Sequence, residues 1–78
     1  MPTVLEIEGF RFFFYSADRN EPPHIHVRKA GKEAKFWLNP IRPAYLGRFK
    51  QSDLRRMIEI LEEKQEFILE QWNGQFNS

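Results

Sequence analysis

The stretch HIHVRKAGKEAKFWL, residues 24–38, decides the fold because it holds two strand-forming segments around a tight turn. HIHVRK, residues 24–29, and EAKFWL, residues 33–38, alternate in the way expected of strands with one buried face. Ala30-Gly31-Lys32 lies between them, and so short a glycine-containing turn joins antiparallel neighbours. The stretch therefore predicts a β-hairpin.

A second hairpin is predicted upstream of the first. TVLEI, residues 3–7, and the aromatic-rich FRFFFYS, residues 10–16, favour strands, and Glu8-Gly9 forms the turn between them. ADRNEPP, residues 17–23, is rich in turn formers and ends in two prolines, which cannot donate to a sheet ladder. This segment is predicted to be a loop.

Two segments follow the hairpins. NPIRPAYLGRF, residues 39–49, has two prolines and a glycine, and it is predicted to be a crossing loop. Within it, Tyr45, Leu46 and Phe49 are expected to tuck inward.

Residues 52–73 change to the period of an amphipathic helix, with Lys50 or Ser52 as its cap and Gly74 as its stop. The core stripe of this helix is Leu54, Met57, Ile58, Leu61, Gln65, Ile68, Leu69 and Trp72, while Ile60 and Phe67 are expected on the opposite side.

These elements predict a single α+β domain over residues 1–78. Its four-stranded, mainly antiparallel sheet precedes one long C-terminal helix (β-β-β-β-α), which packs on one face. With 15% aromatic and 29% charged residues, the composition suits a folded domain. Because the chain has no cysteine, disulfides, thiolate metal sites and cysteine nucleophiles are excluded. The first residues lack the pattern of a signal peptide, so we expect a cytoplasmic protein that is not bound to a membrane.

Alternate side chains on a strand share a face, so each predicted strand divides into two sets. The apolar sets form the expected core face: Leu5, Ile7, Phe10, Phe12, Phe14, Ile25, Val27, Ala34, Phe36 and Leu38. The other sets carry cations and large aromatics: Arg11, Phe13, Tyr15, His24, His26, Arg28, Lys35 and Trp37. One helix cannot cover both faces, so this second face is expected to be open to water or to a partner, and its eight residues are the candidate binding site.

Three functions are open to the histidine pair. His24 and His26 could share a metal ion with a third ligand from Asp18, Glu21 or Glu33, although Arg28 and Lys35 would repel a cation.

The pair could also act as acid and base in RNA cleavage, with Arg28, Lys35 or Arg11 stabilising the developing charge. In the third alternative the face binds without chemistry. RNA bases would stack on its aromatic rings, or a protein partner or a second copy of the chain would cover it.

The segments MPTVLEIEGFRFFFYS, NEPPHIHV, AKFWLNP and the closing EQWN together resemble a small prokaryotic family of unknown function, DUF4160. The family signature falls on Pro22, Pro23, His24 and His26, and its aromatic strand falls on residues 12–15. Lys50 departs from the family at the position of the helix-capping serine. The resemblance implies a short stand-alone protein whose gene neighbours another small family, as in toxin–antitoxin pairs.

We therefore expect a module that binds its partner without catalysis and needs no cofactor. The expected partner is a protein, the product of the neighbouring gene, with RNA and a homodimer as alternatives. A ribonuclease or metal-dependent hydrolase that uses His24, His26 and Arg28 is the alternative function.

Overall fold

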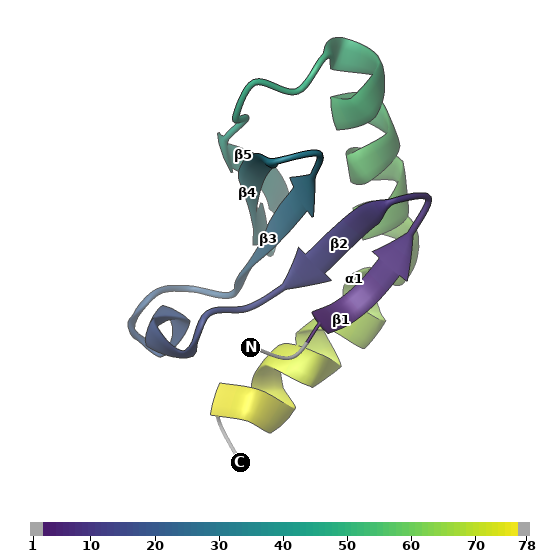
Figure 1. Ribbon diagram of the computed structural model, residues 1–78. Coiled ribbons are helices and arrows are strands. Elements are labelled where there is room, and N and C mark those ends of the chain that lie inside the picture. Colours follow the sequence, from purple (N-terminus) through teal and green to yellow (C-terminus); the bar gives the residue numbers. More distant parts are fainter. Residues whose placement is uncertain (1–2, 77–78) are drawn as a thin grey trace.

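The computed structural model describes residues 3–76, which form one sheet with a long helix against one of its faces (Figure 1). The strands are β1 (Thr3–Ile7), β2 (Phe10–Phe13), β3 (His24–Lys29), β4 (Lys32–Leu38) and β5 (Ile41–Tyr45). A 3-10 helix, η1 (Ser16–Asn20), joins β2 to β3, and the helix α1 (Gln51–Phe76) ends the chain. Neighbouring strands are antiparallel and follow chain order. The α+β class and the C-terminal helix are confirmed.

The sheet has five strands, so the prediction of four was wrong. The missing strand is β5, which lies in the predicted crossing loop and pairs with β4 through Trp37 and Arg42, and through Leu38 and Ile41. Pro43 argued against a strand there. Because β5 is an edge strand, only one of its sides needs donors, and an edge tolerates proline.

Both predicted hairpin turns are present and consist of two residues each. Glu8 and Gly9 have φ values of 55° and 85°, and Ala30 and Gly31 have φ values of 53° and 78°. Two consecutive positive φ values match the right-handed twist of the flanking strands. The predicted strand boundaries around residues 30–32 shift by one position, because Lys32 already belongs to β4.

The core lies between α1 and the predicted apolar face of the sheet. All ten residues assigned to that face belong to the core or pack against it, and Phe12, Ile25 and Phe36 are fully buried. From α1, Met57, Leu61, Ile68 and Trp72 are buried, while Leu54, Ile58 and Leu69 are partly buried. The predicted division of the strands into two faces is therefore correct for the core.

Some details of the helix differ from the prediction. Ile60 is buried in the core, since a twisted five-stranded sheet covers a wider strip of α1 than the predicted stripe, whereas Phe67 is exposed as expected. Gly74 does not stop the helix, because Phe76 packs on Trp72 at 4.3 Å between ring centroids. Lys50 caps the helix through its carbonyl oxygen, which accepts from Asp53 N–H at 3.1 Å.

The segment after β5 also differs from its expected packing. Phe49 is buried, but the side chains of Tyr45 and Leu46 remain exposed, by 46% and 42%. They therefore do not order this segment by tucking into the core. Within residues 3–76, no helix combines the length and the apolar character that crossing a membrane requires.

Candidate functional site

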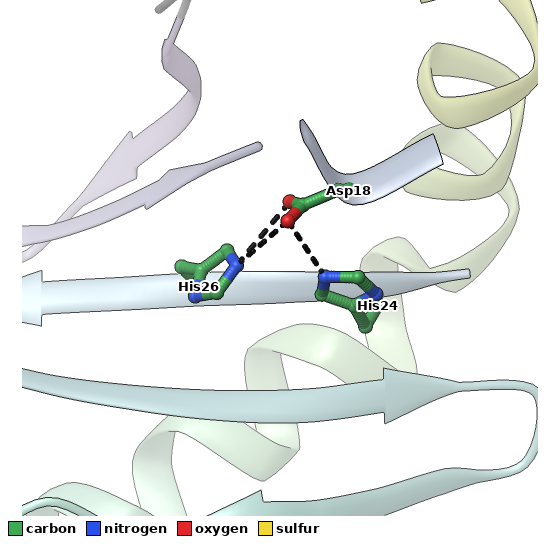
Figure 2. Close-up of side chains that lie close together, drawn as sticks. All are labelled: Asp18, His24 and His26. Atoms are coloured by element: carbon green, nitrogen blue, oxygen red, sulfur yellow. Dashed lines mark hydrogen bonds and ion pairs between the residues drawn. The ribbon is translucent and has the colours of Figure 1, made fainter. Parts of the chain in front are cut away.

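A cluster of three side chains lies where η1 meets β3. The Asp18 carboxylate sits between the two imidazoles: its Oδ1 is 3.1 Å from His24 Nε2, and its Oδ2 is 3.2 Å from His26 Nε2 (Figure 2). The side chains of His24, His26 and Asp18 are only 1%, 7% and 11% exposed. This Asp18 cluster therefore brings three potential ligand or acid–base groups together in a nearly dry environment.

Local backbone geometry fixes the position of Asp18. The Tyr15 N–H donates to Asp18 Oδ2 at 2.8 Å, and the Asp18 N–H donates to the Tyr15 carbonyl oxygen at 3.1 Å. The Glu21 N–H donates to the Asp18 carbonyl oxygen at 3.1 Å and closes the turn. Aspartate favours such turns because its short side chain reaches the nearby backbone. The sequence at residues 15–21 thus folds on itself and aims the carboxylate at the sheet.

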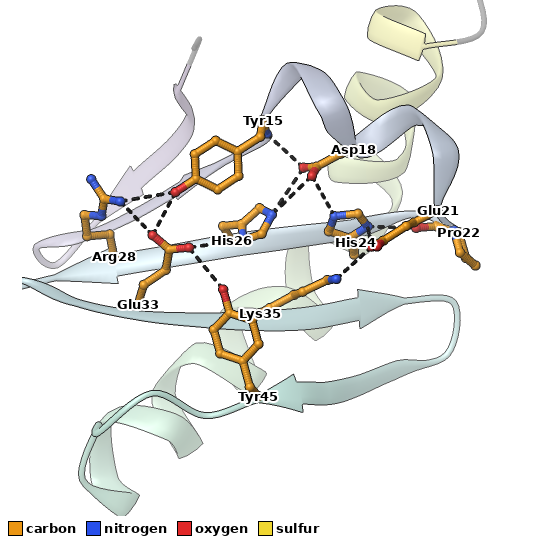
Figure 3. A network of polar contacts seen from close by, with 10 residues as sticks. All are labelled: Tyr15, Asp18, Glu21, Pro22, His24, His26, Arg28, Glu33, Lys35 and Tyr45. Carbon is orange, nitrogen blue, oxygen red and sulfur yellow. Dashed lines mark hydrogen bonds and ion pairs between the residues drawn. The ribbon is translucent and has the colours of Figure 1, made fainter.

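Each imidazole also has an acceptor on its outer side (Figure 3). His24 Nδ1 donates to the Pro22 carbonyl oxygen at 2.9 Å, because a carbonyl oxygen can only accept. His26 Nδ1 lies 3.4 Å from Glu33 Oε2 and is buried without a hydrogen bond. The two histidines therefore share one arrangement, with Nε2 facing Asp18 and Nδ1 facing a second oxygen.

Glu33 connects this cluster to the rest of the second face. Its Oε1 accepts from the Tyr15 hydroxyl at 2.9 Å and from Arg28 Nη2 at 2.7 Å, while its Oε2 accepts from the Tyr45 hydroxyl at 3.1 Å. Burial opposes ionisation of Glu33, but these three bonds outweigh it and lower the pKa of the carboxyl. Burial and the bond to Glu33 raise the pKa of Tyr45 to about 12. Glu33 is therefore an ionised acceptor at neutral pH.

Burial decides the protonation of His26. Removal of the ring from water disfavours the imidazolium and lowers the pKa of His26, although the charge of Asp18 acts in the opposite direction. The ring is also enclosed by aromatic groups: Phe13 stacks on it at 5.6 Å, and Tyr15 meets it edge-on at 4.5 Å. The neutral form of His26 is therefore favoured in the folded protein.

The candidate binding residues do not form the open face that was expected. As whole residues, Phe13, His24 and His26 are only 4%, 1% and 6% exposed. Asp18 of η1 covers the two histidines, and Arg11 and Arg28 lie over the Phe13 ring. His24 is covered from the helix side as well, since its ring lies 5.2 Å from that of Trp72. The prediction that the imidazoles line an open surface was therefore wrong. The chain covers this part of the sheet itself.

The remaining candidates stay accessible to different degrees. Arg11 and Arg28 are exposed and paired across β2 and β3, with their guanidinium carbons 5.6 and 5.4 Å from the Phe13 ring. Lys35 and Trp37 are partly buried, and Lys35 Nζ lies 4.6 Å from the indole centroid. The exposed part of the face therefore consists of two separate areas, one around Arg11 and Arg28 and one around Trp37.

Among the cavities that residues 3–76 form, two lie outside the Asp18 cluster and bear on binding. The first, of about 370 Å³, contains the indole of Trp37 and is lined by Pro22, Pro23, Trp37, Asn39, Pro40 and Arg42; we call it the Trp37 pocket. The second, of about 470 Å³, is a mainly apolar groove between β5 and α1, lined by Pro43, Leu46, Gln51, Leu54, Arg55, Ile58, Glu59 and Glu62. Neither cavity is lined by Asp18 or by a histidine.

Sequence reasoning missed part of the polar network. Glu33 was considered only as a metal ligand, yet its alternation with Lys35 and Trp37 places it on the second face, so the pattern could have revealed it. The part played by Tyr45 carried no such signal, because its segment was not recognised as a strand.

Comparison with known proteins gave one match. The model of a family described as "Domain of unknown function (DUF4160)" matches residues 9–73 of the 78-residue chain. No curated protein and no solved structure matched.

Proposed function

Because the chain belongs to the DUF4160 family, whose function is unknown, we propose a function from its geometry. The protein is a cytoplasmic module that binds a protein partner without catalysing a reaction. It acts as one component of a two-gene system of the toxin–antitoxin type, and its partner is the product of the neighbouring gene.

The Trp37 pocket is the observation that carries this proposal. It combines a partly exposed indole with three prolines and Arg42, on the face predicted to bind. Tryptophan and arginine are the residues that most often dominate the binding energy of protein interfaces. Prolines hold their backbone in place, so such a pocket loses little conformational entropy when a partner's side chain enters it. An apolar or aromatic side chain of a partner protein would fill this pocket.

The same face offers little to RNA bases. A stacking platform needs aromatic rings with a free side, but Phe13 is buried beneath Arg11 and Arg28. The Tyr15 ring packs against His26, and its hydroxyl is bonded to Glu33. Acid–base cleavage is disfavoured for a related reason, since the buried His24 and His26 rings leave no room for a substrate. These contacts favour a protein partner over RNA.

Coexpression with the neighbouring gene tests the proposal. The two proteins should copurify, and the Trp37→Ala variant should weaken the complex by about 2 kcal/mol or more, the range of a central interface residue. Leu46→Ala is the matched control, because Leu46 is an exposed apolar residue of the other cavity. This control should leave the affinity within about 0.5 kcal/mol of the wild type.

Other outcomes would contradict the proposal. A complex that loses affinity through Leu46→Ala and not through Trp37→Ala would place the contact in the groove between β5 and α1. Loss of the complex after ribonuclease treatment, or a steep fall in affinity with salt, would identify RNA as the partner. A dimer of the chain alone, abolished by Trp37→Ala, would identify a second copy as the occupant of the pocket.

A further inference from the structure

We propose that Asp18, His24 and His26 form a binding site for one divalent transition-metal ion, of which Zn²⁺ is the reference case. The ion would lie between His24 Nε2, His26 Nε2 and an oxygen of Asp18. These three ligand atoms lie within 4.8 Å of one another, and within residues 3–76 no other group of three such side chains converges in this way. The inference is independent of the proposed function.

When both imidazoles are neutral, they carry fewer N–H groups than they have polar contacts. Both imidazoles face an acceptor at each nitrogen: Asp18 on the inner side, and either Pro22 or Glu33 on the outer side. A neutral imidazole carries a single N–H, so two neutral rings hold two protons for these four contacts. The proton of His24 is assigned to Nδ1 by the Pro22 carbonyl oxygen. Its Nε2 faces Asp18 Oδ1 at 3.1 Å, and in a neutral ring this nitrogen offers a lone pair to a metal ion.

His26 repeats this arrangement. Its Nδ1 is buried without a hydrogen bond, and Glu33 Oε2 at 3.4 Å is the nearest carboxylate oxygen on that side. Its Nε2 lies 3.2 Å from Asp18 Oδ2 and forms a hydrogen bond with Oδ1 at 3.5 Å. Two imidazole nitrogens and a carboxylate oxygen therefore converge on one point, where a divalent cation would replace the proton that the Nε2 atoms share with Asp18.

The outer contacts resemble those that support known metal ligands. A histidine that binds a metal usually donates its second N–H to a backbone carbonyl or a carboxylate, which fixes the ring and raises its basicity. Here His24 donates to the Pro22 carbonyl oxygen, the Glu33 carboxylate lies 3.4 Å from His26 Nδ1, and the Tyr15 N–H orients Asp18. Each of the three ligands is therefore held by a separate outer contact.

The cations near the cluster do not oppose an ion. Lys35 Nζ is bonded to Glu21 Oε1 at 2.7 Å, and Arg28 Nη2 is bonded to Glu33 Oε1 at 2.7 Å. The repulsion expected from these side chains is thus balanced by a carboxylate in each case. Two imidazoles and one carboxylate suit Zn²⁺, Co²⁺ or Fe²⁺, and they suit Ca²⁺ or Mg²⁺ poorly because those ions prefer oxygen ligands.

Metal titration of the full chain, with any tag removed and after treatment with a chelator, tests the site. The wild type should bind one Zn²⁺ per chain with a rise in melting temperature, and Co²⁺ should give the visible absorption of a four-coordinate ion. Asp18→Asn should reduce the affinity about 100-fold or more, and Glu33→Gln about 10- to 100-fold. Glu63→Gln is the control for the loss of one carboxylate, because Glu63 lies on α1 and its side chain is 72% exposed. It should bind like the wild type.

The histidine signals of the wild type provide a readout that does not depend on any variant folding. The chain contains two histidines, so long-range ¹H–¹⁵N spectra can follow all four ring nitrogens. Zn²⁺ should shift both Nε2 signals and leave both Nδ1 atoms protonated. Absence of one-to-one binding by the wild type would overturn the proposal. Unperturbed Nε2 signals, or an Asp18→Asn variant that folds and binds as tightly as the wild type, would overturn it too.

Discussion

The sheet is covered by two different kinds of structure. On one face α1 contributes apolar side chains, and Phe36, Met57 and Leu61 are fully buried there. On part of the other face, η1 contributes a carboxylate that lies between two buried imidazoles. Apolar contacts depend mainly on volume, whereas buried polar contacts depend on the correct donor, acceptor and charge. The helix-covered face should therefore respond to lost volume, and the η1-covered face to lost protons and charges.

The largest effect is expected from Phe36→Ala on the helix-covered face. Phe36 is fully buried, so its truncation leaves a cavity and should lower the free energy of unfolding by about 3–5 kcal/mol. Urea unfolding measures this loss, and the milder Phe36→Leu should cost clearly less. A loss below about 1 kcal/mol for Phe36→Ala would show that this face is not the tightly packed one.

A smaller effect is expected where the chain after β5 passes the strand that carries Glu33. Gly47 has a φ of 64°, and a Cβ there would collide with the Glu33 carbonyl oxygen. Gly47→Ala should therefore destabilise the protein by about 2 kcal/mol or more and disturb the Tyr45 bond to Glu33.

Gly74→Ala is the matched control for Gly47→Ala. Gly74 lies within α1, and a Cβ there would meet open space. This substitution should stabilise the protein by about 0.5–1 kcal/mol, because alanine favours a helix. Equal effects of the two substitutions in thermal unfolding would show that the close approach at Gly47 has no energetic consequence.

Tyr15→Phe tests the hydroxyl bonds of Tyr15 on the η1-covered face. The ring and its contact with His26 are kept, but the hydroxyl bond to Glu33 at 2.9 Å and the bond from Arg28 at 3.2 Å are lost. We expect a loss of about 1–2 kcal/mol in urea unfolding, because each such bond contributes about 1 kcal/mol and the bond from Arg28 is exposed to water. Tyr45→Phe should cost less, because Tyr45 is 46% exposed and water can replace its hydroxyl. The reverse order would contradict the assignment of the buried network to Tyr15.

The two faces also differ in how much of them the sequence predicts. Alternation along Ile25, Val27 and Phe36 predicts the core face, because alternate residues of a strand share a face and only one of the two sets is apolar. The burial of Ile60 was not predicted. The apolar stripe of a helix has no sharp edge, and the twist of the sheet determines how much of the stripe is covered.

The η1-covered face was predicted only as a set of candidates. Asp18, Glu21 and Glu33 were equal possibilities as a third ligand, because residues 17–23 have no period from which their side-chain directions follow. The choice depends on the turn that joins Tyr15 to Asp18 and on the strand register that brings Glu33 to His26. Strand β5 was missed for a related reason. The prolines of its segment argue against a strand unless the strand lies at an edge, and its edge position follows only from the complete sheet.

The smallest effect we predict is a pH dependence that belongs to the η1-covered face alone. Burial lowers the pKa of His26 in the folded protein below its ordinary value of 6.5. As the pH falls from 7 to 6, the unfolded chain therefore takes up more protons at this residue than the folded protein, and stability decreases. One group can change the free energy of unfolding by at most about 1.4 kcal/mol per pH unit, and near its unfolded pKa only part of this is expressed.

Urea unfolding in the presence of a chelator, at several pH values between 7 and 6, measures this decrease. His26→Gln should reduce the slope, whereas Phe36→Leu should lower the stability equally at every pH, because its neighbours in the core do not titrate. Asp18, His24 and Glu33 face the His26 ring, so the difference between the wild type and His26→Gln isolates the contribution of His26 from theirs. Stability that rises as the pH falls would mean that His26 is charged in the folded protein. The inner contact to Asp18 would then already hold a proton, which leaves no place for a metal ion.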